Sequence, residues 1–508
     1  MNQIKPEILA DNSEVTINSQ QVATLKKHFP QCFDKNGNFI AEKLNAIISS
    51  SGTAFSKESY GLSWLGKSYA RLLANENPLT LLAEDKEHNQ KPENQNSENL
   101  LIKGDNLEVL KHLKGAYSES IKMIYIDPPY NTGSDGFVYQ DDRKFTPDQL
   151  AELAGIEQDE AKRILEFTQS KANSHSAWLT FMYPRLYIAR ELLNDEGVIF
   201  ISIDENENAQ LKLLCNEVFG EQNFAGEIAW KNSSKNDQAY ISIQHEYVLC
   251  YVKSKECNSG EWLEKKEGLE EIYKAFEGFK KKHGDDWDAI HKEALAWYKN
   301  FPESNPIINS KHYSWMDERG VYFPDNISKP ANGYYYEIIH PVTKKPCKKP
   351  AGGWRFIEET MNSKISENRI HFGKDHTVVP NNKTYLKNTE FQSLSSIKFK
   401  DGRVASNLLK SLFREKDIFT NPKDTEVLVD FFKAVNVRED DIILDFFAGS
   451  GTTAHAVMDL NKGDNGNRKF ICVQLPEETD KSKAAYKAGY KTIFDITKAR
   501  IEKAAEKI

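Results

Sequence analysis

Residues 442–457 read IILDFFAGSGTTAHAV, and the fold class that we predict follows from this stretch. Its apolar residues up to Asp445 are typical of a strand buried on both faces of a parallel sheet. Gly449 and Gly451 then predict a tight turn, followed by a helix whose first backbone amides point back at that turn. Such a strand, turn and helix can hold a nucleotide-like ligand.

The glycines by themselves leave other ligands open. The segment GSGTTA also fits the dinucleotide fingerprint, with Glu477 and Glu478 near the distance at which an acid for a ribose is expected. A nicotinamide cofactor is therefore an alternative on this motif alone. A phosphate-binding loop is less favoured, because no lysine follows the glycines where the β- and γ-phosphates need one.

A second apolar stretch, IKMIYIDPPY at residues 121–130, places the tetrapeptide Asp127-Pro128-Pro129-Tyr130 at the end of a strand, where ligands of open α/β sheets collect. An aromatic amine is a poor nucleophile, because its lone pair is delocalised into the ring. The Asp127 carboxylate and the Pro128 carbonyl can accept from both N–H bonds of such an amine, and the two prolines fix the backbone that aims them. Tyr130 offers a ring on which a base swung out of a duplex can stack. Alone, the tetrapeptide would indicate a rigid turn; its pairing with the glycine turn favours the catalytic interpretation.

The rest of the chain predicts where the α/β unit begins, breaks off and resumes. A length of 508 residues exceeds what one hydrophobic core usually supports, so we expect several units. Strands separated by helices predict a doubly wound, mostly parallel α/β sheet. The predicted parts are a helical N-terminal region at 1–85, a polar linker at 86–99, a first catalytic part at 100–230, an irregular inserted target-recognition domain at 231–418 and a second catalytic part at 419–508.

Composition excludes several classes of protein. Hydrophobic residues make up 39% and charged residues 28%, as in ordinary globular proteins and unlike disordered chains. There is no signal-peptide pattern and no apolar run of about 18 residues, so we expect a cytoplasmic protein without a membrane segment. The six cysteines form no CxxC pair and no histidine cluster has metal-ligand spacing, so no metal site is predicted.

Positive charge is concentrated in one region of this acidic chain. The formal net charge is -8, yet 13 Lys and Arg residues outnumber 6 Asp and Glu residues between positions 341 and 403, which gives that stretch +7. Clustered positive charge with interleaved aromatic rings is typical of a DNA-contacting surface. The alternative is an ordinary small domain with an aromatic core and solvated lysines. The aromatic residues are Tyr334, Tyr335, Tyr336, Trp354, Phe356 and Phe372.

The two motifs and their order resemble DNA amino-methyltransferases of the β class, in which the catalytic tetrapeptide precedes the cofactor motif. The segments IKGDNLEVLKHL (102–113) and WLTFMYPRLYIARELL (178–193) resemble the modification subunits of type III restriction-modification systems, and this resemblance covers about residues 86–508. It implies a circularly permuted methyltransferase fold, S-adenosyl-L-methionine as methyl donor and double-stranded DNA as substrate. In this family, enzymes that methylate cytosine N4 commonly have Ser at the first position of the tetrapeptide, and enzymes that methylate adenine N6 have Asp. Since this chain has Asp127 there, the resemblance implies adenine N6. It also implies a restriction subunit as partner and a modification subunit that dimerises.

The resemblance also implies cofactor-binding residues. It places Asp105 against the adenine of the cofactor and Lys423 against its carboxylate. From the residues alone, Asp105 equally fits a helix N-cap and Lys423 a solvated surface position. Relatives often carry a ribose-binding acid where this chain has Gln474, and Glu477 is an open substitute. The other implied residues are Phe447, Gly449, Gly451 and Thr452 around the methionine part, Asp445 at the strand end, and Phe419 and Asn421 in the FxNPK element.

Two further functions remain open at this point. One is a DNA-binding specificity subunit that does not catalyse, and intact DPPY and GSG segments weigh against it. The other is an amino-methyltransferase that acts on RNA. In related folds of that kind Asn commonly replaces the first Asp, so Asp127 and the basic stretch favour DNA.

Overall fold

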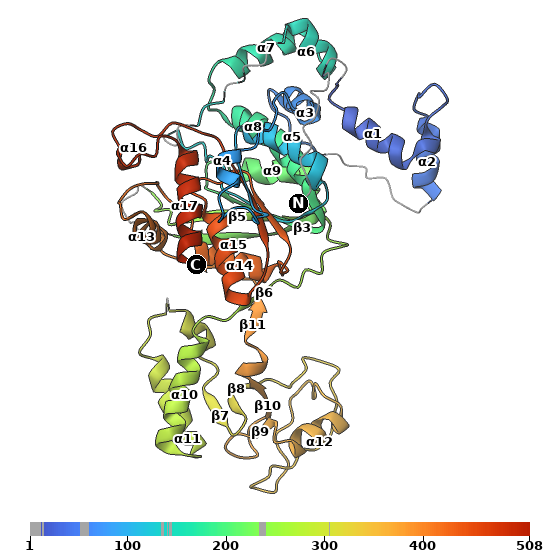
Figure 1. The fold of residues 1–508 in the computed structure, drawn as a ribbon. Coiled ribbons are helices and arrows are strands. Elements are labelled where there is room, and N and C mark those ends of the chain that lie inside the picture. The colour runs from blue at the N-terminus through green and yellow to red at the C-terminus, as the bar shows by residue number, and fades with distance from the viewer. Residues whose placement is uncertain are drawn as a thin grey trace. The chain divides into compact units, whose positions relative to one another are not determined.

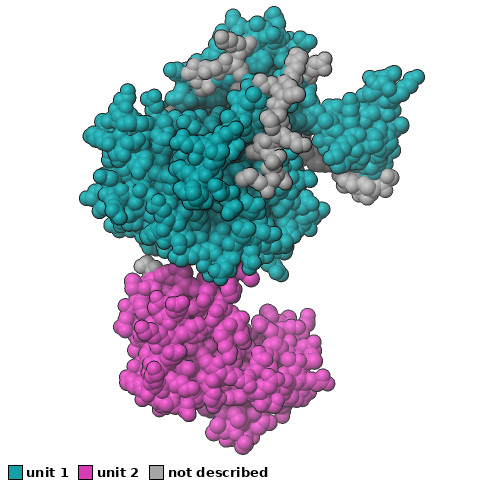
Figure 2. All heavy atoms as spheres, viewed as in Figure 1, with its two compact units in different colours: residues 1–262, 395–508 teal, residues 263–394 magenta. Residues whose placement is uncertain are grey.

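The computed structural model describes residues 12, 15–50, 60–133, 137–139, 141, 145–232, 240–303 and 305–508. The chain forms two compact units, coloured separately in Figure 2. The first unit comprises residues 1–262 and 395–508, and the second comprises residues 263–394. The chain therefore leaves the first unit once and returns to complete it.

An eight-stranded sheet forms the centre of the first unit (Figure 1). Its strand order is β1-β14-β13-β2-β3-β5-β4-β12, and β5 runs antiparallel to both of its neighbours while the other pairs are parallel. The predicted mostly parallel α/β sheet is confirmed. The strands are β1 (Leu100–Lys103), β2 (Ile121–Ile126), β3 (Leu193–Ile203), β4 (Phe224–Lys231), β5 (His245–Val252), β12 (Ile397–Phe399), β13 (Ile442–Asp445) and β14 (Lys469–Gln474).

Helices cover this sheet, and the apolar helix α8 (His175–Leu192) is central among them. Trp178, Met182 and Leu186 of α8 are fully buried in the main core, so burial drives its formation. Pro184 lies inside α8, which continues past it as one helix. The other helices of the first unit are α1 (Ser19–His28), α2 (Ala41–Ser50), α3 (Lys67–Asn75), α4 (Lys86–Asn89), α5 (Asn106–Tyr117), α6 (Pro147–Ala154), α7 (Gln158–Gln169), α9 (Asn208–Phe219), α13 (Gly402–Phe413), α14 (Thr425–Ala434), α15 (Thr452–Asp464), α16 (Ala484–Lys487) and α17 (Ile493–Lys507), with the short 3-10 turns Pro30–Cys32 and Glu221–Asn223.

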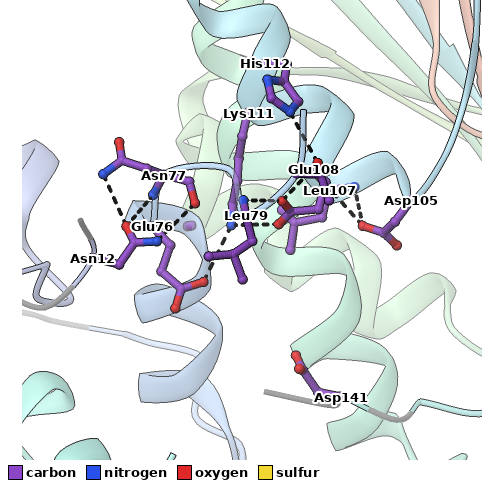
Figure 3. A network of polar contacts seen from close by, with 12 residues as sticks. Asn12, Glu76, Asn77, Leu79, Asp105, Leu107, Glu108, Lys111, His112 and Asp141 are labelled. Atoms are coloured by element: carbon purple, nitrogen blue, oxygen red, sulfur yellow. Dashed lines mark hydrogen bonds and ion pairs between the residues drawn. The ribbon is translucent and has the colours of Figure 1, made fainter. Parts of the chain in front are cut away.

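The N-terminal helical region is tied to α5 by a polar network, seen from close by in Figure 3. The Lys111 ammonium lies 3.5 Å from Glu76 and 3.2 Å from Glu108, and its side chain is only 2% exposed. Glu108 also accepts a 2.6 Å hydrogen bond from the backbone N–H of Leu79. The segment after α3 is therefore held against the helix that follows β1.

The polar run at 86–99, predicted as a linker without structure, contains the four-residue helix α4. The Asp85 side chain caps α4 by accepting from the backbone N–H of His88. An N-cap carboxylate satisfies an amide that the first turn leaves unpaired.

No helix among the described residues is long and apolar enough to cross a membrane.

The second unit is built from short elements around two small cores. One core joins α10 and α11 through Ile272, Phe276 and Ile290, and the other surrounds Trp354. A four-stranded antiparallel sheet has the order β7-β8-β10-β9, and β6 pairs with β11. The elements are β6 (Leu263–Lys265), α10 (Leu269–His283), α11 (Trp287–Tyr298), β7 (Trp315–Asp317), β8 (Gly320–Asp325), α12 (Glu358–Ser366), β9 (Ile370–His371), β10 (Asn381–Tyr385) and β11 (Phe391–Ser393), with 3-10 turns at Pro306–Ser310 and Leu386–Asn388.

The second unit is shorter at both ends than the predicted insertion at 231–418. Residues 245–252 form β5 inside the central sheet, and residues 402–413 form α13 of the first unit. β5 adds next to β3 in the antiparallel sense, so it lies outside the strand-helix-strand rhythm from which the boundary was predicted.

Candidate active site

The four strands β1, β14, β13 and β2 are neighbours and parallel, so their carboxyl ends lie at one edge of the sheet. Asp127 follows β2, and Asp445 and Gln474 end β13 and β14. Asp105 stands two residues after β1, at the start of α5. Four of the predicted site residues therefore meet at the edge where ligands of parallel α/β sheets bind.

The predicted glycine turn after β13 has the backbone that requires glycine. Gly449 has φ +53° and Gly451 has φ +84°, a region that side chains disfavour. The backbone N–H of Gly449 donates to the Gln474 side-chain oxygen at 2.7 Å, and the Thr497 hydroxyl donates to the Gly449 carbonyl at 2.6 Å. Gln474 therefore shapes the turn by binding its backbone.

A buried arginine that the sequence analysis missed supports the same turn. Arg500 of α17 is 1% exposed and donates to the hydroxyls of Ser450 and Thr452 at 2.6 and 2.8 Å. Its burial lowers the pKa of the guanidinium to about 10. The ring of Phe419 lies close to Gly449: a side-chain Cβ at position 449 would be 3.4 Å from it. The structure thus brings the predicted residues Thr452 and Phe419 to the glycine turn.

Asp445, also predicted for the cofactor site, is 3% exposed at the end of β13. Its carboxylate accepts from the Thr453 hydroxyl at 2.6 Å and from the backbone N–H of Phe447 at 3.0 Å. Burial raises the pKa of Asp445 to about 7, against the opposing effect of these two hydrogen bonds. Asp445 therefore closes the start of the turn, while Phe447 is half-buried beside it.

Asp105 is the N-cap of α5, as one of its two predicted interpretations requires. Its carboxylate accepts from the backbone N–H of Leu107 at 2.9 Å and of Glu108 at 3.2 Å (Figure 3). Arg185 of α8 lies 3.0 Å from the other oxygen of Asp105, whose side chain is 45% exposed. Arg185 also donates to Asn106, which in turn donates to the Phe446 carbonyl. This chain of bonds links the start of α5 to the residue that follows β13.

The tetrapeptide Asp127-Pro128-Pro129-Tyr130 is held on both sides. Pro128 is buried, and the carbonyl of Pro129 accepts a 2.7 Å hydrogen bond from the indole N–H of Trp178. The Tyr130 hydroxyl donates to Asp127 at 2.7 Å. The Asp127 side chain remains 30% exposed. A rigid backbone therefore presents a carboxylate that a substrate can reach.

Lys423 lies beside this carboxylate, so its predicted alternative as a solvated surface residue is wrong. Its side chain is 12% exposed, and its ammonium stands 3.2 Å from Asp127 and 2.7 Å from the Tyr130 hydroxyl. Asn421, two residues earlier, is exposed with φ +52°, a left-handed conformation that Asn tolerates. The FxNPK element thus brings its lysine to Asp127 and Tyr130.

Glu246 of β5 completes this group of charges and was missed by the sequence analysis. Its two carboxylate oxygens lie 2.9 and 2.8 Å from the Lys423 ammonium, and its side chain is 9% exposed. The signal available in the sequence was a single acid within the apolar run EYVLCYV at residues 246–252. A buried acid needs a partner, but the run does not say which one.

In the second unit the predicted DNA-contacting residues divide into core and surface. Trp354 is fully buried, and Tyr336, Phe356 and Phe372 pack against its core. Tyr334 and Tyr335 are 46% and 66% exposed. The core interpretation therefore holds for Trp354, Tyr336, Phe356 and Phe372, while DNA contact by the exposed residues stays a prediction. Exposed basic residues of this region include Lys344, Lys345, Lys348, Lys349 and Arg355.

Comparisons with known proteins agree on one family. Residues 121–482 match the family model N6_N4_Mtase, described as DNA methylase. The chain is 53% identical over 501 residues to the Mod subunit of the type III restriction-modification enzyme EcoP15I of Escherichia coli, covering 97% of this chain and 77% of that protein. It is 49% identical over 512 residues to the EcoPI Mod subunit of Escherichia phage P1, covering 97% of this chain and 76% of that protein.

Proposed function

Because the chain belongs to the DNA methylase family, and within it to the Mod subunits of type III restriction-modification systems, we propose that it methylates the N6 amino group of adenine. Membership of this family makes the chain a DNA methyltransferase and confirms the prediction of S-adenosyl-L-methionine as methyl donor. The proposal concerns the target atom and the residues that act on it.

The observation that carries the proposal is the placement of Asp127. Its carboxylate is 30% exposed on a tetrapeptide anchored by Trp178 and lies at the same sheet edge as the glycine turn. A fixed acceptor aimed at an amine localises the nitrogen lone pair without having to reorganise during the reaction. The carbonyl of Pro128 is the proposed second acceptor, and the Tyr130 ring the surface on which the target base stacks.

Burial raises the pKa of Asp127, and the negative charge of Glu246 raises it further, while Lys423 opposes both. A raised pKa makes this carboxylate a better acceptor for the proton that N6 loses when the new N–C bond forms. Asp127 supports adenine N6 over cytosine N4 through the family resemblance, in which Asp at this position goes with adenine and Ser commonly goes with cytosine.

The residues at the sheet edge suit S-adenosyl-L-methionine, whose sulfonium makes its methyl group electrophilic when it is bound. Gly449 and Gly451 let the ligand approach the backbone closely, since neither carries a side chain in the turn. Asp105 presents a carboxylate that is 45% exposed. We assign Phe419, Asn421, Phe447, Thr452 and Gln474 to the same cofactor site. Lys423, predicted to lie against the cofactor carboxylate, pairs instead with Glu246 and Asp127.

The second unit, residues 263–394, is the proposed target-recognition part. Exposed lysines beside the exposed rings of Tyr334 and Tyr335 supply charge for the phosphates and surfaces for bases. The relatives are named as Mod subunits of type III restriction-modification enzymes. We therefore extend the proposal to a restriction subunit as partner, a dimer of this chain and a cytoplasmic location, where the DNA substrate lies.

The test is single-molecule sequencing of DNA from cells that express the full chain or its Asp127→Ala variant, scored for N6-methyladenine by sequence context. We expect one motif to be methylated by the intact chain and left unmethylated by the variant. Normal methylation by a folded Asp127→Ala protein would refute the assignment of Asp127. Absence of methylation by an intact chain that binds S-adenosyl-L-methionine and DNA would favour the non-catalytic specificity subunit.

A further inference from the structure

Four side chains at the catalytic edge form one charged cluster: Asp127, Tyr130, Glu246 and Lys423. Burial raises the pKa of Tyr130 well above its usual value, so the phenol stays protonated. The cluster therefore holds two carboxyl groups and one ammonium group. The Lys423 ammonium therefore pairs with two carboxylates, and its distances to their oxygens show which of the two it binds more closely.

The sharing is unequal. An ammonium group has three N–H donors, and the three shortest contacts of Lys423 run to the two oxygens of Glu246 at 2.8 and 2.9 Å and to the Tyr130 oxygen at 2.7 Å. Asp127 is fourth, at 3.2 Å. Glu246 is also the more enclosed acid, with a side chain 9% exposed against 30% for Asp127.

We propose that Glu246 is a positioning residue for methyl transfer, which occupies the donors of Lys423 so that the Asp127 carboxylate remains available to the target amine. This inference rests on the proposed function, because it takes Asp127 as the acceptor for N6. Glu246 acts through Lys423 and does not itself touch the base.

The physical reason is a competition between two donors for one acceptor. Without Glu246, Lys423 and Asp127 form a one-to-one buried ion pair, and a charge-assisted bond between them is stronger than a bond from a neutral amine. The incoming amine then has to displace the lysine. With Glu246 in place the lysine donors are already satisfied, and the Tyr130 hydroxyl, at 2.7 Å, is the closest donor to Asp127.

The same arrangement predicts a change in pH dependence. Glu246 raises the pKa of Asp127 and Lys423 lowers it. Removing the Glu246 charge leaves Lys423 unopposed, so the pKa of Asp127 falls and the acidic limb of the rate profile moves to lower pH. The groups that face Asp127 from the surrounding elements are Tyr125 of β2, Tyr130, Glu246 of β5, Lys423 and Asp445 of β13.

The experiment measures kcat/KM for methylation of a DNA duplex carrying the motif found by sequencing, across pH, for full-length Glu246→Gln, Glu246→Asp and Lys423→Met proteins and the double variant Glu246→Gln/Lys423→Met. We expect Glu246→Gln to lower kcat/KM by about 10- to 100-fold and to shift the acidic limb downward, with partial recovery in Glu246→Asp. Glu426→Gln is the matched control, because that side chain is 76% exposed and pairs with Lys400.

A double-mutant cycle separates positioning from general support of the fold. If Glu246 acts through Lys423, the Glu246→Gln change causes no further loss in the Lys423→Met background, where it also removes the second acid with which Asp127 would share a proton. Additive losses, or a loss of activity without a shift of the pH profile, would overturn the inference and leave Glu246 as a structural residue. Full activity of Glu246→Gln would overturn it too. The proposed function fails separately, through the Asp127→Ala protein, so the two failures are distinguishable.

Discussion

Two clusters in the first unit have the same composition, one lysine between two acids, yet differ in how open they are. Lys111 lies between Glu76 and Glu108, whose side chains are 5% and 13% exposed (Figure 3). Lys423 lies between Glu246 and Asp127, and there the second acid is 30% exposed. A closed cluster satisfies its own charges and joins parts of the fold. An open cluster keeps one acid within reach of a ligand.

The comparison separates a buried charged cluster that stabilises the fold from a partly exposed one that can contact a ligand. In the closed cluster Glu108 also accepts from the backbone of Leu79, so its bonds fix the segment after α3. In the open cluster the bonds gather around Lys423 and leave Asp127 with the longest contact. Breaking the first should change stability, and breaking the second should change catalysis.

The largest expected effect follows Lys423→Met. Two acids then lie close together without a cation, so they share a proton and Asp127 is a poorer acceptor for the amine. We expect methylation under single-turnover conditions to fall about 10³-fold, or roughly 4 kcal/mol in activation free energy. Lys433→Met, on the exposed side of α14, is the control. Activity within threefold of the control would show that the open cluster is structural like the closed one.

The closed cluster gives the second effect, through Lys111→Met. Removing a cation whose side chain is 2% exposed leaves Glu76 and Glu108 without their shared partner. We expect the free energy of unfolding in urea to fall by about 3 kcal/mol, with kcat unchanged in the folded protein. A Lys111→Met protein of unchanged stability, or a folded one with a lowered kcat, would contradict the division of roles.

Asp445 sharpens the comparison, because its hydrogen bonds come from neutral donors, the Thr453 hydroxyl and the Phe447 amide. Its pKa is raised to about 7 in the folded chain. A folded-state pKa above the unfolded value means that the folded state binds the extra proton, so stability falls as pH rises from about 4 through 7. We expect about 2 kcal/mol to be lost between pH 5 and pH 8, and this loss to disappear in Asp445→Asn. Urea unfolding at several pH values measures the free energy of unfolding as a function of pH. If this free energy falls with pH as steeply in Asp445→Asn as in the unmodified chain, the raised pKa of Asp445 is refuted.

The smallest effect is expected for Tyr130→Phe. The hydroxyl accepts from Lys423 and donates to Asp127, while the ring on which we propose that the base stacks remains. Loss of one neutral hydrogen-bonding group should lower kcat about fivefold to tenfold, or roughly 1 kcal/mol. Tyr130→Ala, which also removes the ring, should lose more, and equal losses in the two variants would argue against stacking.

Much of the fold could be predicted because its signals are local. The strands at 121–126 and 442–445 are continuous apolar runs, and each ends at the residue that the structure places at the sheet edge. The N-cap interpretation of Asp105 rested on the residues that follow it and is confirmed. The broad boundary at 231–418 had no such local support, since β5 joins the sheet by long-range antiparallel pairing.

The sequence by itself determined the sheet type, the glycine turn, the position of the DPPY tetrapeptide after a strand and the presence of a lysine in the FxNPK element. Only the tertiary structure decided the partners of that lysine, because Glu246 and Tyr130 lie 177 and 293 residues away along the chain. The same holds for Arg500, which reaches Ser450 across 50 residues. Backbone conformation is set by neighbours in sequence, whereas a buried charge is satisfied by whichever groups the fold brings within hydrogen-bonding distance.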